Sequence, residues 1–168
     1  DVTFFSNNYY KNKTLELWKT VAAHYAGNPA VAAYDTLNEP GEKAGTTSSK
    51  HWAFYDQMYK TIRSVDPDHI IIMESCWGTA NLPKPSDYGW SNVMYEYHHY
   101  TWNYISDLQG QKDSCKNLIN SINNANYGVP TYIGEYTCFG LEDAWTYVMD
   151  EFNKAGWNYT SWAYKTNN

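Results

Sequence analysis

Two glutamates follow apolar segments of the kind that form buried strands. Glu39 comes shortly after residues 31–37, and Glu135 comes directly after residues 130–134. Cleavage of a glycosidic bond needs one carboxylic acid that protonates the leaving oxygen and one carboxylate that acts as nucleophile or general base. If the fold brings Glu39 and Glu135 to one rim, the pair predicts glycosidic-bond cleavage.

Polar and aromatic side chains also lie at or just after the ends of the other predicted strands, and they include Trp77, His98, His99, Tyr100 and Trp162. Aromatic rings suit a sugar site because the C–H faces of a pyranose are apolar and stack on indole or phenol rings. His98 and His99 are neighbours and therefore point to opposite sides of a strand. We assign His98 to the site and His99 to the structure.

The elements that must position these residues alternate between helices and strands. Apolar residues recur at helical spacing in four segments, residues 13–25, 52–65, 115–123 and 141–155. Short apolar runs with strand character occupy residues 31–37, 69–74, 93–97, 130–134 and 158–163. Strands joined by helical crossovers form a parallel sheet, and the carboxyl ends of its strands meet at one edge. We therefore predict an α/β protein whose site lies at that edge.

Composition excludes several classes of protein. The 168-residue chain has a formal net charge of −6 and no run of Lys or Arg, which argues against nucleic acid or an anionic membrane surface as a partner. No apolar run approaches the ~18 residues of a membrane-spanning helix. Cys76, Cys115 and Cys138 lack metal-site spacing, so we predict no metal and no other cofactor. The 18% aromatic content fits either a Tyr-rich core or a groove that stacks on sugars.

Four segments, in order, resemble motifs of glycoside hydrolase family 5, the cellulase-like family of retaining (β/α)8 barrels. They are residues 34–40 around Asn38-Glu39-Pro40, residues 97–100, residues 132–136 and residues 161–165. The resemblance covers nearly the whole chain. It implies a retaining, endo-acting O-glycosyl hydrolase whose substrate is a β-glucan such as cellulose. Because polymeric glucans lie outside cells, it also implies a secreted protein.

The resemblance implies a role for each matched residue. Glu39 is expected to be the general acid/base, and Glu135 the nucleophile, with Tyr100 donating a hydrogen bond to it. Glu74 and Glu96 are expected to be buried partners rather than catalytic groups. The residues expected to bind substrate or to support the carboxylates are Asn38, His98, Tyr100, Trp162 and, as a possible second platform, Trp77.

The matched strands correspond to the fourth to eighth strands of the barrel, so residues 1–168 are interpreted as one partial (β/α)8 domain. A complete barrel typically has ~250 residues. The Arg and His that the family places on its second and third strands have no counterpart in the sequence. Five parallel strands leave two edges with unpaired backbone groups, and we expect a homo-oligomer that covers them. The alternatives are a piece of a longer enzyme, and a weak or inactive barrel that binds carbohydrate or self-assembles.

Overall fold

The computed structural model describes the chain except residues 1, 41–46, 76–77, 80 and 164–168. Five strands form one parallel sheet in the order β1-β2-β3-β4-β5, so neighbouring strands follow one another along the chain. Helices connect them, and the predicted partial (β/α)8 fold is confirmed. The chain divides into two compact units, residues 1–95 and residues 96–168, with the division inside β3 (Val93–Tyr100).

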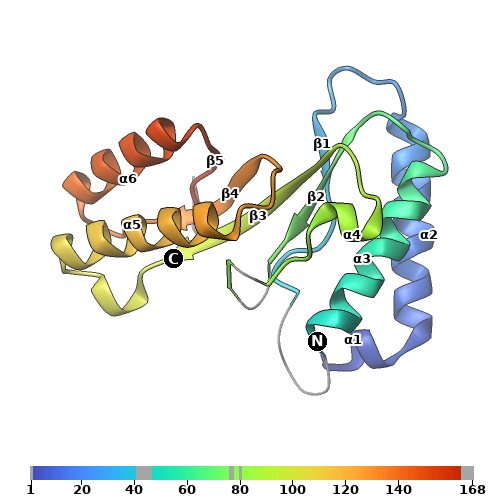
Figure 1. Cartoon of the computed structure of the whole chain (residues 1–168), viewed down its shortest axis with the longest axis horizontal. Helices are drawn as coiled ribbons and strands as arrows, with labels where there is room; N and C mark the ends of the chain where they lie inside the picture. The colour runs from blue at the N-terminus through green and yellow to red at the C-terminus, as the bar shows by residue number, and fades with distance from the viewer. Residues whose placement is uncertain (1, 41–46, 76–77, 80, 164–168) are drawn as a thin grey trace. The chain divides into compact units, whose positions relative to one another are not determined.

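The first unit contains six further elements: α1 (Val2–Ser6), α2 (Asn8–Tyr25), β1 (Ala33–Asp35), α3 (Ser48–Arg63), β2 (Ile70–Glu74) and α4 (Pro85–Tyr88). β1 pairs in parallel with β2, with Tyr34 opposite Ile71. α2 and α3 lie side by side (Figure 1, blue and teal). The core between helices and strands includes residues with at most 2% exposure, among them Phe54, Tyr55, Met58, Ile62, Ile71 and Met73.

The second unit contains the 3-10 helix η1 (Trp102–Tyr104), α5 (Leu108–Ala125), β4 (Thr131–Thr137), α6 (Glu142–Ala155) and β5 (Asn158–Tyr159). β4 and β5 pair in parallel, and α5 packs beside α6 (Figure 1). Its core includes an aromatic cluster, in which the rings of Tyr136, Phe152 and the half-buried Tyr159 contact one another at centroid distances of 5.5–5.8 Å.

Several predicted boundaries were wrong, each for a local reason. The helix expected at residues 13–25 begins at Asn8, because the Asn7 side chain caps it by accepting a hydrogen bond from the Tyr9 N–H at 2.9 Å. The strand expected at residues 93–97 continues to Tyr100. The strands expected at residues 31–37 and 158–163 are shorter in the structure. No helix in the described part of the chain is both long and apolar enough to cross a membrane.

A buried charged network fixes the start of β2 in the first unit. Asp66 is fully buried, and its Oδ2 accepts hydrogen bonds from the Tyr34 hydroxyl at 2.6 Å and from His69 Nδ1 at 2.5 Å. The other ring nitrogen of His69, Nε2, lies 3.0 Å from the Asn28 carbonyl. Both ring nitrogens thus face hydrogen-bond acceptors, the Asp66 carboxylate and the Asn28 carbonyl. Each of these bonds therefore needs a proton on His69, and both form when the ring is protonated at both nitrogens.

This network should make folding stability depend on pH. The bonds from His69 to the Asn28 carbonyl and to Asp66 raise the pKa of His69 above its ordinary 6.5. Burial opposes ionisation of Asp66, but hydrogen bonds from Tyr34 and from the Asp68 and His69 backbones prevail and lower the pKa of Asp66 below its ordinary 3.8. The His69 contribution is complete below pH 6.5 and falls as pH rises through its raised pKa. The Asp66 contribution is complete above pH 3.8 and falls as pH drops through its lowered pKa.

We therefore expect the network to stabilise the fold most between about pH 4 and pH 6.5. Urea denaturation of the wild type and of His69→Gln across pH 3–9 measures this contribution. The difference between the two midpoints should be largest inside that window and should shrink on its alkaline side. A difference that is constant across the series would contradict the protonated state of His69.

Candidate active site

Glu39 stands in an unusual backbone conformation at the carboxyl end of β1. Its φ is +39°, a left-handed value that residues with a side chain seldom adopt. Its N–H donates a hydrogen bond of 2.5 Å to Oε2 of Glu74, which is 2% exposed. The Glu39 side chain is exposed. The buried carboxylate of Glu74 therefore holds the backbone of Glu39, while the Glu39 carboxylate is exposed. Strained backbone conformations of this kind are common at functional sites.

Helix α3 fixes the strand end that carries Glu74. The Tyr55 hydroxyl donates to the Glu74 carbonyl at 2.9 Å, and the Glu74 N–H donates to the same hydroxyl at 3.0 Å. Tyr55 is fully buried. The expectation that Glu74 is a buried partner is thus confirmed, and its partner is the backbone of Glu39.

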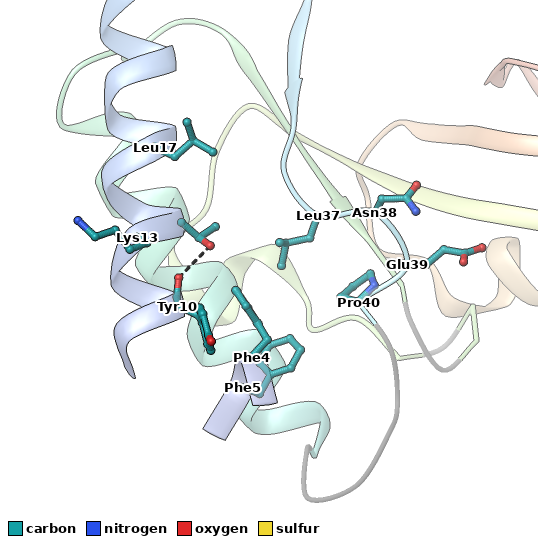
Figure 2. A pocket seen from close by; sticks show the side chains of 10 residues that line it. Phe4, Phe5, Tyr10, Lys13, Leu17, Leu37, Asn38, Glu39 and Pro40 are labelled. Carbon is teal, nitrogen blue, oxygen red and sulfur yellow. Dashed lines mark hydrogen bonds between the residues drawn. The ribbon is translucent and has the colours of Figure 1, made fainter. Parts of the chain in front are cut away.

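A pocket of about 450 Å³ lies beside Glu39 in the first unit. Its lining comes from α1, α2 and the segment after β1, and consists of Phe4, Phe5, Tyr10, Lys13, Thr14, Leu17, Leu37, Asn38, Glu39 and Pro40. Figure 2 shows Leu37 pointing toward the helices, whereas Asn38 and Glu39 point the other way. The wall is thus mostly apolar, with the two polar candidates at its rim.

In the second unit, Glu135 is held by two side chains from β3. The Tyr100 hydroxyl donates a hydrogen bond of 2.5 Å to Glu135 Oε2, which confirms the expected contact. His98 Nδ1 lies 3.6 Å from the same oxygen, and its Nε2 lies 3.5 Å from Oε1 of Glu96. His98 therefore lies between two carboxylates, while His99 is 7% exposed and its burial lowers its pKa to about 4.

A bulge in β4 turns Glu135 toward these partners. The Thr160 N–H donates to the Ile133 carbonyl, and the Trp162 N–H donates to the Tyr136 carbonyl, both at 2.9 Å. The two donors, Thr160 and Trp162, are two residues apart, whereas their acceptors, Ile133 and Tyr136, are three residues apart. β4 therefore carries one extra residue, which is a β-bulge. The burial pattern along β4 agrees with a bulge: Ile133 and Tyr136, three residues apart, are both buried, whereas Glu135 is not. The extra residue places Glu135 on the same side of the strand as Gly134.

Gly134 leaves room for a buried carboxylate on β3. A Cβ atom at this position would lie 1.5 Å from Oε1 and 2.6 Å from Cδ of Glu96. Glu96 is 2% exposed, so it has little space into which it could move. Glycine is therefore required here for a close approach and not for a special backbone angle.

Gly134→Ala is expected to destabilise the protein by about 1–3 kcal/mol, because the added methyl group overpacks the space that Glu96 occupies. Chemical denaturation measures this effect. Gly140→Ala is the matched control, because a Cβ there meets no atom within 4 Å. Equal stability of the two variants would show that Glu96 relaxes without cost.

Of the two predicted tryptophan platforms, the structure describes Trp162 but not Trp77. Trp162 is 57% exposed and is fixed through its backbone to Tyr136, and the Trp162–Ala163 peptide bond is cis. Trp77 lies outside the described residues. Three tryptophans on the helices are half-buried, and each donates its indole N–H to a backbone carbonyl at 3.0–3.1 Å; they are Trp18, Trp52 and Trp145.

Sequence reasoning missed two features of the site. The bulge in β4 was not expected, although a glycine within a strand is a known signal for a bulge or a close approach. Trp102, just after β3, is predicted neither as a site residue nor as a core residue, and its ring lies nearly parallel to that of Tyr100, at 10° and a centroid distance of 5.5 Å.

The metal-ligating side-chain types of the candidate site are divided between the units, with Glu39 in the first and His98 and Glu135 in the second. Within either unit alone, the described residues do not bring three such side chains together. The second unit offers a carboxylate, Glu135, with Tyr100 and His98 as neighbours, and the first offers an exposed carboxylate, Glu39, on a backbone bonded to Glu74.

Five parallel strands joined by helices, with polar side chains at the carboxyl ends of the strands, are the architecture of part of a (β/α)8 barrel. Residues 3–168 match the family Cellulase (glycosyl hydrolase family 5). The chain belongs to that family.

Curated relatives include endoglucanase A of Evansella cellulosilytica, which is 27% identical over 91% of this chain and 32% of its own. A β-xylosidase of Phanerodontia chrysosporium is 30% identical over 58% of this chain and 20% of its own. The chain thus spans a third or less of the length of these relatives.

Solved structures of similar fold include endo-glycoceramidase II from Rhodococcus sp., with a TM-score of 0.80 and 21% identity, over 94% of this chain and 41% of that one. Endoglucanase Cel5A from Thermotoga maritima gives a TM-score of 0.75 and 26% identity, over 94% of this chain and 60% of that one. The match to about half of these longer chains agrees with a partial barrel.

Proposed function

We propose that this chain carries the catalytic carboxylates of a retaining glycoside hydrolase that cleaves β-glycosidic bonds in a β-glucan such as cellulose. The observation that carries the proposal is the fixed carboxylate of Glu135, with the Tyr100 hydroxyl at 2.5 Å and His98 at 3.6 Å. Both contacts fall on Oε2. This leaves Oε1 as the oxygen positioned for attack.

In the proposed reaction, Oε1 of Glu135 bonds to the anomeric carbon as the glycosidic C–O bond breaks, and Glu39 gives its proton to the departing oxygen. Glu39, now ionised, takes a proton from water, and the water oxygen displaces Glu135 from the sugar. Two inversions give net retention. Asn38, next to Glu39 at the pocket rim, is proposed to bind the sugar 2-hydroxyl, and Trp162, which is 57% exposed, to stack beneath the reacting sugar. Trp77 is proposed as a second platform.

The test is product stereochemistry with a soluble β-1,4-glucan. Proton NMR of the first products should show the β-anomer before mutarotation, together with release of reducing ends. Release of the α-anomer first would overturn the retaining assignment, and no release over long incubation would overturn hydrolysis. Because polymeric glucans lie outside cells, the proposal includes a secreted location.

A second candidate is a carbohydrate-binding or self-assembling partial barrel with little turnover. It is favoured by the position of β1 at the edge of the sheet that the described residues form. Beside that strand, α2 exposes 63% of Tyr9 and 59% of Leu17. We propose a homo-oligomer that covers such surfaces.

Sedimentation at micromolar concentration tests the assembly. The proposal predicts a particle at least twice the 19.5 kDa of one chain. A monodisperse particle of one chain's mass would overturn it. Saccharide binding by calorimetry without any reducing-end release would favour the binding role over hydrolysis.

A further inference from the structure

The segment that follows β3 exposes a large apolar surface. Trp102 is 65% exposed, Ile105 49% and Tyr104 42%. Single exposed apolar side chains are ordinary, but three within four residues form a patch. We infer that Trp102 is a sugar-stacking platform, a specificity-determining residue that binds a pyranose unit neighbouring the one attacked by Glu135. The inference rests on the proposed function.

The ring of Trp102 is connected to the candidate nucleophile through a single side chain. Glu135 accepts the hydrogen bond from the Tyr100 hydroxyl, and the Tyr100 ring lies 5.5 Å from that of Trp102 at an angle of 10°. The Phe139 ring, which follows β4, contacts Trp102 at 5.0 Å and 60°. Trp102 is thus oriented by two aromatic neighbours and still leaves most of its surface open.

Hydrogen bonds from the start of α5 fix the loop that carries Trp102. The Tyr104 carbonyl accepts hydrogen bonds from the Asp107 N–H and from Nε2 of Gln111, both at 3.0 Å. Gln111 is 1% exposed, and Gly110 allows the Tyr104 ring to lie against α5, since a Cβ there would be 2.3 Å from Tyr104 Cδ1. A platform that is already ordered loses little entropy when a ligand binds.

The chemistry of this surface favours a sugar over other ligands. A flat indole face contacts the C–H groups of a pyranose, while the sugar hydroxyls reach nearby polar groups. Here the polar groups are the Glu135 carboxylate and the Tyr100 hydroxyl that donates to it, and the ring of that same Tyr100 stacks on Trp102. A glycan that extends across Tyr100 would place one unit at Glu135 and a neighbouring unit on Trp102.

Calorimetric titration with cellopentaose and with cellobiose tests the inference, using Trp102→Ala, Trp102→Phe and the loop control Ile105→Ala. The measurements use a Glu135→Gln background, so that binding is read without turnover. We expect Trp102→Ala to weaken cellopentaose binding roughly tenfold, and Trp102→Phe and Ile105→Ala by no more than about threefold. The loss should be smaller for cellobiose, because a short ligand need not reach both positions.

Equal losses for Trp102→Ala and Ile105→Ala would overturn the platform even if the wild type hydrolyses glucan. A loss specific to Trp102 in a protein that shows no hydrolysis would support the platform while the proposed hydrolase activity fails. A Trp102→Ala variant that binds cellopentaose normally but sediments as a smaller particle would overturn it in favour of contact with a second copy. Thermal unfolding of each variant verifies that it is folded.

Discussion

Glu135→Gln is expected to lower kcat for β-glucan hydrolysis on the order of 1000-fold or more, because the amide cannot form the glycosyl-enzyme. The side chains of Tyr100 and His98 that contact Glu135 remain in place, and the shape of the residue is unchanged. Substrate affinity should therefore change little, and the loss should fall on kcat. Initial rates with a soluble β-glucan and with an aryl β-cellobioside give both parameters.

Glu142→Gln is the matched control for this substitution. It makes the same chemical change at an exposed position in the first turn of α6, in the same unit. We expect wild-type rates from it. Glu39→Gln provides a contrast, since an acid is needed less when the leaving group is a good one. Its loss should be severe on glucan and mild in the first step on an aryl glycoside. A Glu135→Gln variant with the wild-type rate would refute the nucleophile assignment.

The catalytic candidates could be predicted from the sequence because each follows a recognisable strand. The sequence around Glu39 and Glu135 matches a family pattern, and a hydrogen bond from Tyr100 was expected on that basis. The bulge at Gly134 could not be predicted in the same way. It depends on the hydrogen-bond register between β4 and the segment after β5, which is a property of two distant segments and not of either one alone.

The fold was predictable from periodicity, since long apolar repeats and short apolar runs alternate along the chain. Boundaries were less predictable because they depend on side chains outside the periodic core. Asn7 extends α2 toward the N-terminus by capping it. β3 continues through the polar residues His98 and His99, and the His99 side chain is buried. Tertiary packing, and not local propensity, sets that strand's length.

Asp66→Asn is expected to destabilise the fold by about 3 kcal/mol, because it removes the acceptor on which the buried network depends. Oδ2 of Asp66 accepts from Tyr34 and from His69 Nδ1, and Oδ1 accepts from the backbone N–H groups of Asp68 and His69, at 3.0 and 3.2 Å. An Asn side chain has one oxygen and one NH₂ group. With the NH₂ group on the Oδ1 side it faces two backbone N–H donors, and on the Oδ2 side it faces the N–H of His69 Nδ1. In either orientation the charge of His69 loses its counterion.

Thermal unfolding at pH 5.5, inside the window where the network is fully charged, should show a fall in Tm of roughly 10 °C for Asp66→Asn. Asp68→Asn is the matched control, because it makes the same change two residues away on an exposed side chain, and its Tm should stay within about 1–2 °C of the wild type. The penalty of Asp66→Asn should decrease as pH rises through the raised pKa of His69, because His69 then loses the charge that needs Asp66. If the penalty is the same at every pH above 5.5, the network is held by neutral hydrogen bonds and His69 is not an imidazolium in the folded protein.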